Sequence, residues 1–295
     1  MSELPESVRY KAMVERIDRL PSLPEIVMRL VRVVNSPDTS ADDAAELIEK
    51  DPGLTSTVLR LANSAFFGIP RTISSVTSAV VVLGFNTLRS VALSATVMEM
   101  FGEGGGAKTF RRDRFWRHSI VTAMIARNFA RRNIHALMID PESTFCAGIL
   151  HDIGKLIFEE FCRDEFAAAC NESRTTKRSL FCSEGAVMGV THARIGRVLA
   201  DRWALPLDLE YSIVYHHDPE AADKAREMVT LVHVADLLAH AGGVDLWDGE
   251  VAPGMWPEAR SILGIDDGKW ARLLEEVKQC VEKSSEFFSV VRGGE

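Results

Sequence analysis

The stretch GILHDIGKL, residues 148–156, places His151 and Asp152 side by side inside an otherwise apolar run. The apolar neighbours predict that both polar side chains are buried. Imidazole and carboxylate groups are good ligands for divalent metals. The pair therefore has two explanations: a core histidine hydrogen-bonded to its neighbour, or part of a metal site completed by distant residues. The choice depends on the other histidines and acids of the chain.

Helical periodicity dominates the chain around this stretch. Residues 22–37 open with a capping box, Ser22 and Glu25, and their apolar residues recur at three- and four-residue spacing. Further helices are expected over residues 40–52, 54–68 and 86–101, so the first hundred residues form a bundle of about five helices. In the remainder, helices are expected over residues 109–133, 141–153, 155–171, 192–203, 207–217, 226–241 and 267–290. The predicted fold is all-α.

A glycine-rich stretch, GEGGGAK at residues 102–108, interrupts the helical pattern. Because glycine is costly inside a helix, this segment predicts a linker. We therefore expect two packed helical bundles, residues 1–104 and residues 105–295. Within the second, residues 242–258 lack helical periodicity and predict a surface loop.

Composition limits the classes of function. A net charge of −8 argues against a nucleic-acid partner, because such domains are usually basic. The five cysteines include no C-x-x-C pair, and no signal peptide is recognised, which predicts reduced thiols and a cytoplasmic location. Residues 72–88 are uncharged, but their Ser, Thr and Asn residues favour buried core helices separated by a turn at Gly84 over a bilayer span. No membrane association is expected.

Five further candidate ligands lie on predicted helices away from the opening stretch. One is on an apolar helix face, one follows the N-cap Thr191, two end the helix of residues 207–217, and one is an aspartate in an apolar helix. In chain order these candidates are His118, His192, His216, His217 and Asp236.

Each candidate alone has a structural explanation. A single histidine on an apolar face is more often a core residue than a ligand, and Asp236 could be a buried hydrogen-bond acceptor. The pair His216 and His217 could complement the dipole at a helix C-terminus. The recurrence of such residues on five predicted helices instead favours a shared site for one or two divalent ions, with Fe, Mn, Ni and Zn suited to these ligands.

The order of short motifs resembles a known superfamily. W-R-H-S, G-I-L-H-D-I-G-K-L, T-H-A-R-I-G, Y-H-H and H-V-A-D together resemble the HD superfamily of metal-dependent phosphohydrolases. LPSLPEIVMRL, IEKDPGLTSTVLRLANSAFFG and ISSVTSAVVVLGFNTLRSVAL resemble its signalling-associated branch, the HDOD family. The resemblance extends over residues 15–240. It implies an N-terminal HDOD bundle, a C-terminal HD-like domain, and a signalling or regulatory role exerted on separate partner proteins.

The related HD-GYP phosphodiesterases imply roles for the candidate residues. By this resemblance, one metal is bound by His118, His151, Asp152 and Asp236. Asp152 bridges to a second metal that is bound by His192, His216 and His217. Asp152 and Lys155 are the implied catalytic residues, with Lys155 facing the phosphate. The alternative for Lys155 is a solvated lysine at a helix start.

The chain departs from the HD-GYP pattern after His217. Residues 218–228 read DPEAADKAREM, where a loop bearing Gly-Tyr-Pro would stand. Hydrolysis of cyclic dinucleotides is therefore not expected. The first hypothesis is a signalling protein that retains metal; the alternatives are an active phosphohydrolase acting on a nucleotide or phosphodiester, and an HD-like core without metal.

A basic set lies near the first candidate ligand. It could attract an anionic ligand, or it could be a solvated helix face that pairs with acids. Its members are Arg111, Arg112, Arg114, Arg117, Arg127, Arg131 and Arg132.

Overall fold

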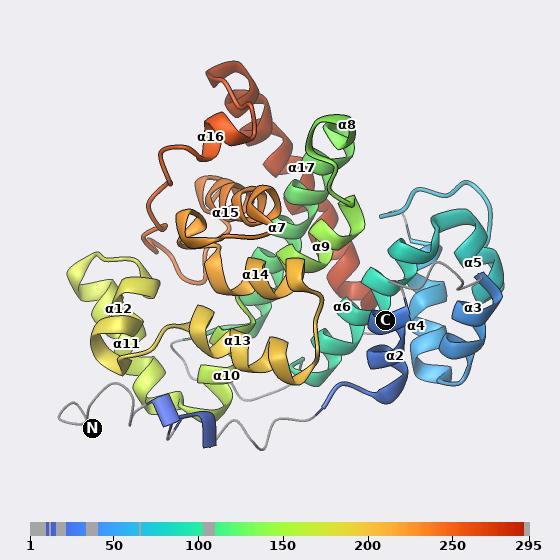
Figure 1. Cartoon of the computed structure of the whole chain (residues 1–295), viewed down its shortest axis with the longest axis horizontal. Helices are drawn as coiled ribbons and strands as arrows, with labels where there is room; N and C mark the ends of the chain where they lie inside the picture. The colour runs from blue at the N-terminus through green and yellow to red at the C-terminus, as the bar shows by residue number, and fades with distance from the viewer. Residues whose placement is uncertain are drawn as a thin grey trace.

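The computed structural model describes residues 10–11, 13–15, 22–33, 41–64, 66–102 and 110–291. Within these ranges the chain contains helices, turns and loops and no strand (Figure 1). The prediction of an all-α fold is confirmed. The apolar side chains of the helices join in one continuous core that runs through both halves of the chain.

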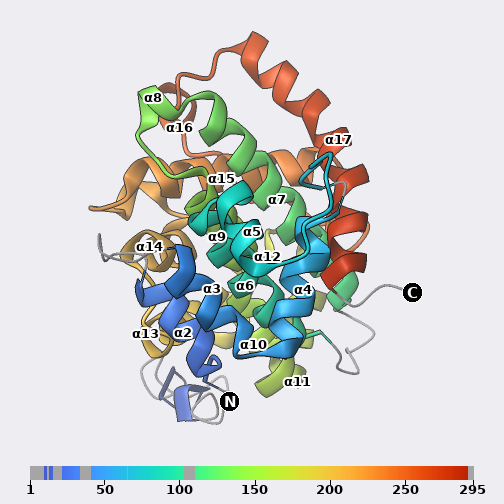
Figure 2. The ribbon, with the colours of Figure 1, turned by 90° about the vertical axis from the view of Figure 1, so that its right-hand side faces the viewer.

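The N-terminal bundle faces the viewer in Figure 2. Asp51 caps the third of its helices by accepting a hydrogen bond from the Leu54 amide at 3.0 Å. Gly84, at φ +83°, turns the chain sharply between the last two helices, as predicted. The helices are α2 (Glu25–Val33), α3 (Ala41–Glu49), α4 (Pro52–Ala62), α5 (Val76–Leu83) and α6 (Phe85–Met100).

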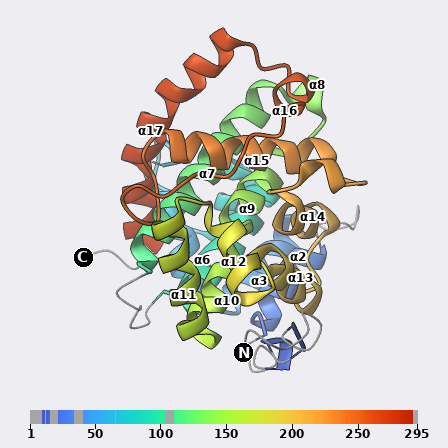
Figure 3. The same ribbon diagram turned by 90° about the vertical axis from the view of Figure 1, so that its left-hand side faces the viewer.

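The C-terminal bundle is seen from the opposite side in Figure 3, where α15 crosses in front of α7. Helix α7 packs closely on the shorter α9, which also contacts α6, α14 and α15, and the long helix α17 packs on α7. The elements are α7 (Arg112–Arg132), α8 (Ile134–Leu137), α9 (Pro141–Leu150), α10 (Ile153–Phe161), α11 (Arg163–Thr176), α12 (Leu180–Met188), α13 (His192–Arg202), α14 (Leu207–Tyr215), η1 (Pro219–Ala221), α15 (Arg226–Ala241), α16 (Ala259–Ile262) and α17 (Asp267–Val291).

Two helices join the bundles. α6 packs on α4 and on α9, and the C-terminal part of α17 returns to α4 (Figures 1 and 2). The rings of Phe66, Phe145 and Phe287 meet at this junction with centroids 5.0–5.9 Å apart. The predicted linker lies largely in residues 103–109, outside the described residues, so the division into 1–104 and 105–295 stays a prediction.

Three local predictions are corrected. The single helix expected over residues 155–171 is two helices, because α10 ends at Phe161 and α11 begins at Arg163. Helix α12 was not predicted; Ser179 caps its start, and Gly189, at φ +72°, ends it. Residues 242–258 form no helix, as expected, but they are more than a surface loop, because Val244, Leu246 and Trp247 are buried.

In the described part of the chain, no single helix is long and apolar enough to cross a membrane. α5 and α6 together reach the required length and apolar composition, but they are bent by 117° relative to each other. Most of α6 is buried in the core.

Candidate metal centre

The HD pair lies at the junction of α9 and α10. His151 is the C-terminal cap of α9, and Asp152 is the residue before α10. The two side chains are 0% and 1% exposed. Both residues are therefore buried, as their apolar neighbours predict.

Two glycines of the same motif let neighbouring helices approach this junction. A Cβ atom at Gly148 would lie 2.4 Å from the Cα of Ala123 in α7. A Cβ atom at Gly154 would lie 2.0 Å from the backbone oxygen of His192 at the start of α13. Since real Cβ atoms do not approach so closely, only glycine permits these contacts. The motif GILHDIG thus brings α7 and α13, with their histidines, to the HD pair.

The first group of candidate ligands comes from α7, α15 and the HD junction. His118 Nε2 lies 3.0 Å from Asp236 Oδ1. His151 Nε2 lies 3.4 Å from Asp152 Oδ2 and 3.9 Å from Asp236 Oδ1. The structure therefore brings together the four residues that the resemblance implies for one metal.

The second group comes from α13 and the end of α14. His192 Nε2 lies 3.0 Å from Asp152 Oδ1, and His216 Nε2 lies 3.5 Å from the same oxygen. His217 Nε2 lies 3.1 Å from His192 Nε2. One ligand atom from each of these four residues lies within 4.8 Å of the others. Asp152 belongs to both groups, which is the position that a bridging carboxylate requires.

Four of the imidazole rings are oriented in the same way. In each, Nδ1–H can donate a hydrogen bond to a nearby oxygen. A neutral ring held in this way presents the lone pair of Nε2 to the interior of the cluster. These contacts are His118 to Val244 O (2.7 Å), His151 to Gly148 O (2.8 Å), His192 to Glu184 Oε2 (2.6 Å) and His216 to Ser212 O (3.0 Å).

Several buried atoms of the cluster lack a hydrogen-bond partner among the described residues: His151 Nε2, Asp152 Oδ1 and Asp236 Oδ2. Each can act as an acceptor, and Asp152 Oδ1 lies 3.0 Å from His192 Nε2, which is itself an acceptor in the neutral ring. Burying such groups without a partner costs several kcal/mol per ion, roughly. A divalent cation removes this cost, because imidazole nitrogen and carboxylate oxygen are its ordinary ligands. The donor set therefore fits one or two divalent ions.

The electrostatics of Asp152, Asp236 and His216 agree with this donor set, whereas Glu184 outweighs burial and raises the pKa of His192. Burial raises the pKa of Asp152, but Lys155 and His151 outweigh it and hold that pKa well below its usual range. Burial likewise opposes ionisation of Asp236, but its contacts with His118 and His240 outweigh burial and keep the pKa of Asp236 low. Burial lowers the pKa of His216 to about 4, so this ring is neutral near pH 7. Anionic carboxylates and a neutral imidazole are the protonation states that bind metal.

Lys155 is not the solvated lysine that the alternative reading expected. Its side chain is buried, and Nζ lies 2.5 Å from Asp152 Oδ2. The first turn of α10 places the two side chains three residues apart on one face. Lys155 is therefore the cation that partly neutralises Asp152. Its role in catalysis stays a prediction.

Two residues at the cluster were missed from the sequence. Glu184 Oε2 accepts hydrogen bonds from the His192 amide at 2.8 Å and from its ring, which fixes that ring. His240 Nε2 lies 3.5 Å from Asp236 Oδ1, and its Nδ1 lies 2.7 Å from Asp245. The four-residue spacing that places Asp236 and His240 on one helix face could have revealed His240 from the sequence. Glu184 lies on the unpredicted helix α12, so no comparable pattern pointed to it.

The basic set pairs largely with acids, which favours the second interpretation given for it. Five of its seven arginines make ion pairs: Arg111 with Asp113, Arg112 with Glu159 and Glu160, Arg114 with Asp248, Arg127 with Glu142, and Arg132 with Glu276.

An all-helical protein with a buried histidine–aspartate cluster at an HD junction is of the HD-like structural class. The HDOD domain model matches residues 20–219, and the chain belongs to the HDOD domain family.

Similar proteins of known sequence or structure agree with this family. The chain is similar to an HDOD domain protein of unknown function from Geobacter sulfurreducens, with 27% identity and a TM-score of 0.80, over 96% of this chain and 99% of that one. A proposed phosphohydrolase from Shewanella amazonensis SB2B is 26% identical with a TM-score of 0.73, over 95% and 98% of the two chains. An uncharacterised protein of Treponema pallidum (strain Nichols) is 25% identical over 92% of this chain. The match covers 51% of that curated protein, so this chain spans about half its length.

Proposed function

We propose that this chain is an HDOD-family signalling protein that binds one or two divalent ions in its C-terminal half and acts by binding a separate protein. The observation that carries the metal site is the convergence of four oriented Nε2 atoms on two buried carboxylates. His118, His151, Asp152 and Asp236 would hold one ion. Asp152, His192, His216 and His217 would hold the other.

The enclosure of the cluster supports regulation or stabilisation over catalysis. Among the proposed ligands, His217 alone is partly exposed. The side chains that are at most 2% exposed are those of His118, His151, Asp152, His192, His216 and Asp236. A catalytic metal site needs an open coordination position for water or substrate, whereas a structural site is closed. Ligands from separate helices would then tie the C-terminal bundle together.

The cytoplasm is the proposed location. The five cysteines are all free thiols, and four of them are buried. Burial raises the pKa of Cys146 to about 11, which keeps this thiol protonated and unreactive. Such cysteines suit a reducing compartment.

A metal-dependent phosphohydrolase is the second candidate. A divalent ion in such a site lowers the pKa of water and neutralises charge on phosphoryl oxygens. Lys155 would orient a phosphate from its place beside Asp152, and the similar Shewanella protein bears the name of a proposed phosphohydrolase. The segment after His217 forms the short helix η1 and carries no Gly-Tyr-Pro sequence, so a cyclic dinucleotide is not the proposed substrate.

The experiment that tests the proposal measures metal content and turnover on the same preparations. Protein purified without chelator should contain one or two equivalents of Fe, Mn, Ni or Zn by plasma mass spectrometry. With Mn²⁺ added, it should turn over neither nucleotides nor phosphodiesters in a substrate panel. Metal-free wild-type protein that also fails to take up added ions would refute the metal site. Robust turnover that is absent from Asp152→Ala would favour the phosphohydrolase instead.

The partner is tested separately from the metal. Wild-type and Asp152→Ala protein would be used to capture partners from a lysate after chemical crosslinking. Because the N-terminal bundle has its own helices and contacts, the same protein should be captured by both, provided that the variant is folded by circular dichroism. Capture of no specific protein by the folded wild type would count against the partner-binding role.

A further inference from the structure

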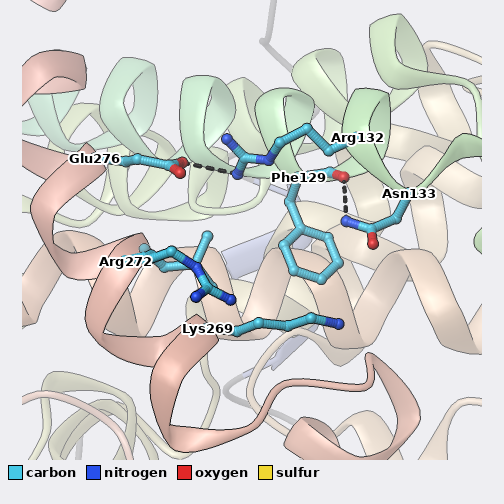
Figure 4. Close-up of a pocket in the computed structure, with 7 residues that line it drawn as sticks. Phe129, Arg132, Asn133, Lys269, Arg272 and Glu276 are labelled. Carbon is cyan, nitrogen blue, oxygen red and sulfur yellow. Dashed lines mark hydrogen bonds and ion pairs between the residues drawn. The ribbon is translucent and has the colours of Figure 1, made fainter.

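A pocket of about 290 Å³ lies between the C-terminal end of α7 and the N-terminal half of α17 (Figure 4). Phe129 and Leu273, both buried, form its apolar lining. Figure 4 shows the Phe129 ring between Arg132 of α7 and Lys269 of α17, with Arg272 beside it. The pocket therefore combines an apolar wall with charged groups from two helices.

The charge of this lining is positive, although the chain carries −8 overall. Arg132, Lys269 and Arg272 face one acid, Glu276, which is already paired with Arg132 at 2.7 Å. Lys269 Nζ donates to the Gly264 carbonyl at 2.7 Å and forms no ion pair with Glu276. Arg272 makes no hydrogen bond or ion pair with any part of the chain that the structure describes. The exposed carboxylate of Asp266 interacts with both Lys269 and Arg272, which hold its pKa below the usual range. Three cations therefore meet two acids at this pocket.

A second hollow of about 330 Å³ adjoins the first and shares Arg132 and Glu276 with it. It adds Arg131 and Lys283, neither of which has an ion-pair partner within the described ranges. The excess of positive charge therefore continues along the groove between α7 and α17. Low-dielectric walls around like charges concentrate the field and attract anions.

We propose that the α7–α17 pocket binds a mononucleotide. Arginine guanidinium groups bind phosphate oxygens through paired hydrogen bonds, and the Arg272 guanidinium donates none within the described residues. The apolar wall of Phe129 and Leu273 suits a base or ribose, which inorganic phosphate lacks. Asn133 Nδ2 donates to Phe129 O at 2.8 Å, so its side-chain oxygen remains as an acceptor for a base. The volume lies at the lower end of small-molecule sites, about 300 Å³.

This site is separate from the metal centre. Phe129 follows His118 by eleven residues on α7, which corresponds to about 16 Å along a helix. The proposal therefore does not depend on the metal centre or on its function. Because both sites use α7, a nucleotide at one end contacts the same helix that presents His118.

The test is titration calorimetry on the full chain at low ionic strength, with AMP, GMP and UMP as probes. Inorganic phosphate and adenosine serve as the two partial ligands. At least one nucleotide should bind about tenfold more tightly than either partial ligand, because it uses both the cations and the apolar wall. Absence of nucleotide binding, or equal binding of phosphate, would overturn the assignment.

A charge-matched pair of variants locates the bound nucleotide. Arg272→Gln removes an exposed cation that makes no hydrogen bond within the described residues, so the fold should be unaffected, and affinity should fall about tenfold. Lys278→Gln removes the same charge from the same helix, at a side chain that is 73% exposed and pairs with Glu275. Its affinity should stay within about twofold of wild type. Unchanged affinity in Arg272→Gln, or an equal loss in Lys278→Gln, would refute the pocket.

Removal of metal by chelation tests whether the nucleotide binds in this pocket or at the metal centre. Nucleotide affinity should survive removal of metal with EDTA and subsequent dialysis. If affinity is lost on chelation and restored by Mn²⁺, while Arg272→Gln binds normally, the nucleotide occupies the metal centre and the proposal is wrong.

Discussion

Asp152 Oδ1 lies 3.0 Å from His192 Nε2, and no hydrogen bond among the described residues satisfies this buried oxygen. The other oxygen of the same carboxylate lies 2.5 Å from Lys155 Nζ. The carboxylate therefore faces one cation and one lone-pair donor. An ion beside Oδ1 would complete an arrangement in which a single aspartate serves both groups of histidines.

Asp152→Ala should abolish binding of both ions, because this residue belongs to both groups. Even without metal, the free energy of unfolding should fall by about 3–5 kcal/mol, since Lys155 is left as a buried cation without a partner. Metal content by mass spectrometry and urea unfolding followed by circular dichroism measure the two effects.

The matched control for that variant is Asp201→Ala on α13, where the side chain is exposed. It should change the free energy of unfolding by at most about 0.5 kcal/mol and leave metal content unchanged. Retention of one full equivalent of metal by Asp152→Ala would contradict the bridging role.

Removal of metal from wild-type protein should lower its melting temperature. Because the ligands come from separate helices, they bind the ion together only in the folded protein. A free ion concentration of 100 times Kd adds about 2.7 kcal/mol to the free energy of unfolding. Scanning fluorimetry before chelation, after chelation and after refilling with Mn²⁺ or Zn²⁺ measures this. A melting temperature that does not respond to any of these steps would argue for an HD-like core without metal.

Glu184→Gln should weaken the second group of ligands without removing any of them. The glutamine oxygen still accepts from His192 Nδ1, but its lack of charge makes the ring a weaker donor, and affinity should fall about 10–100-fold. Competition with a chromogenic chelator gives the affinity. Glu172→Gln on α11 is the control, because its side chain contacts none of the proposed ligands; an equal loss there would refute the role of Glu184.

Gly154→Ala should destabilise the protein and reduce metal binding together. The new Cβ would meet His192 O, a backbone atom that can move only with the whole start of α13. Chemical denaturation and metal content should both respond.

Gly185→Ala provides the comparison within a helix. Nothing lies within 4 Å of a Cβ atom at Gly185, so this substitution should stabilise α12 by about 0.5–1 kcal/mol. If Gly154→Ala instead gained stability and kept its metal, the close approach of α10 and α13 would not be required for the site.

Lys155→Met distinguishes the two candidate functions. The substitution removes the cation next to Asp152, so the cluster becomes more negative, and metal content should be kept or increased. Any phosphoester turnover by wild type should disappear, whereas a regulatory protein should keep its partner binding. Turnover that persists in the metal-loaded variant would exclude Lys155 from catalysis.

Local signals in the sequence determined the helices and most of the candidate ligands. The spacing of apolar residues and the cap at Thr191 are encoded within a few residues, so most helix ranges could be read directly. The predicted capping box at Ser22 and Glu25 is wrong, because the helix begins only at Glu25. The burial of His151 and Asp152 followed from their apolar neighbours. Even Asp152 as a shared ligand came from the order of motifs, which the resemblance supplied.

Tertiary structure alone decided which side chains meet. Lys155 reads as a solvated lysine, yet it is buried against Asp152; Glu184 lies on a helix with no clear pattern, yet it orients His192. The α7–α17 pocket joins residues more than 130 positions apart, Arg132 and Lys269, and no local pattern relates them. The physical reason is the separation along the chain of the residues that interact. Helix propensity depends on neighbours within about one turn, whereas burial and ion pairing depend on how distant helices pack.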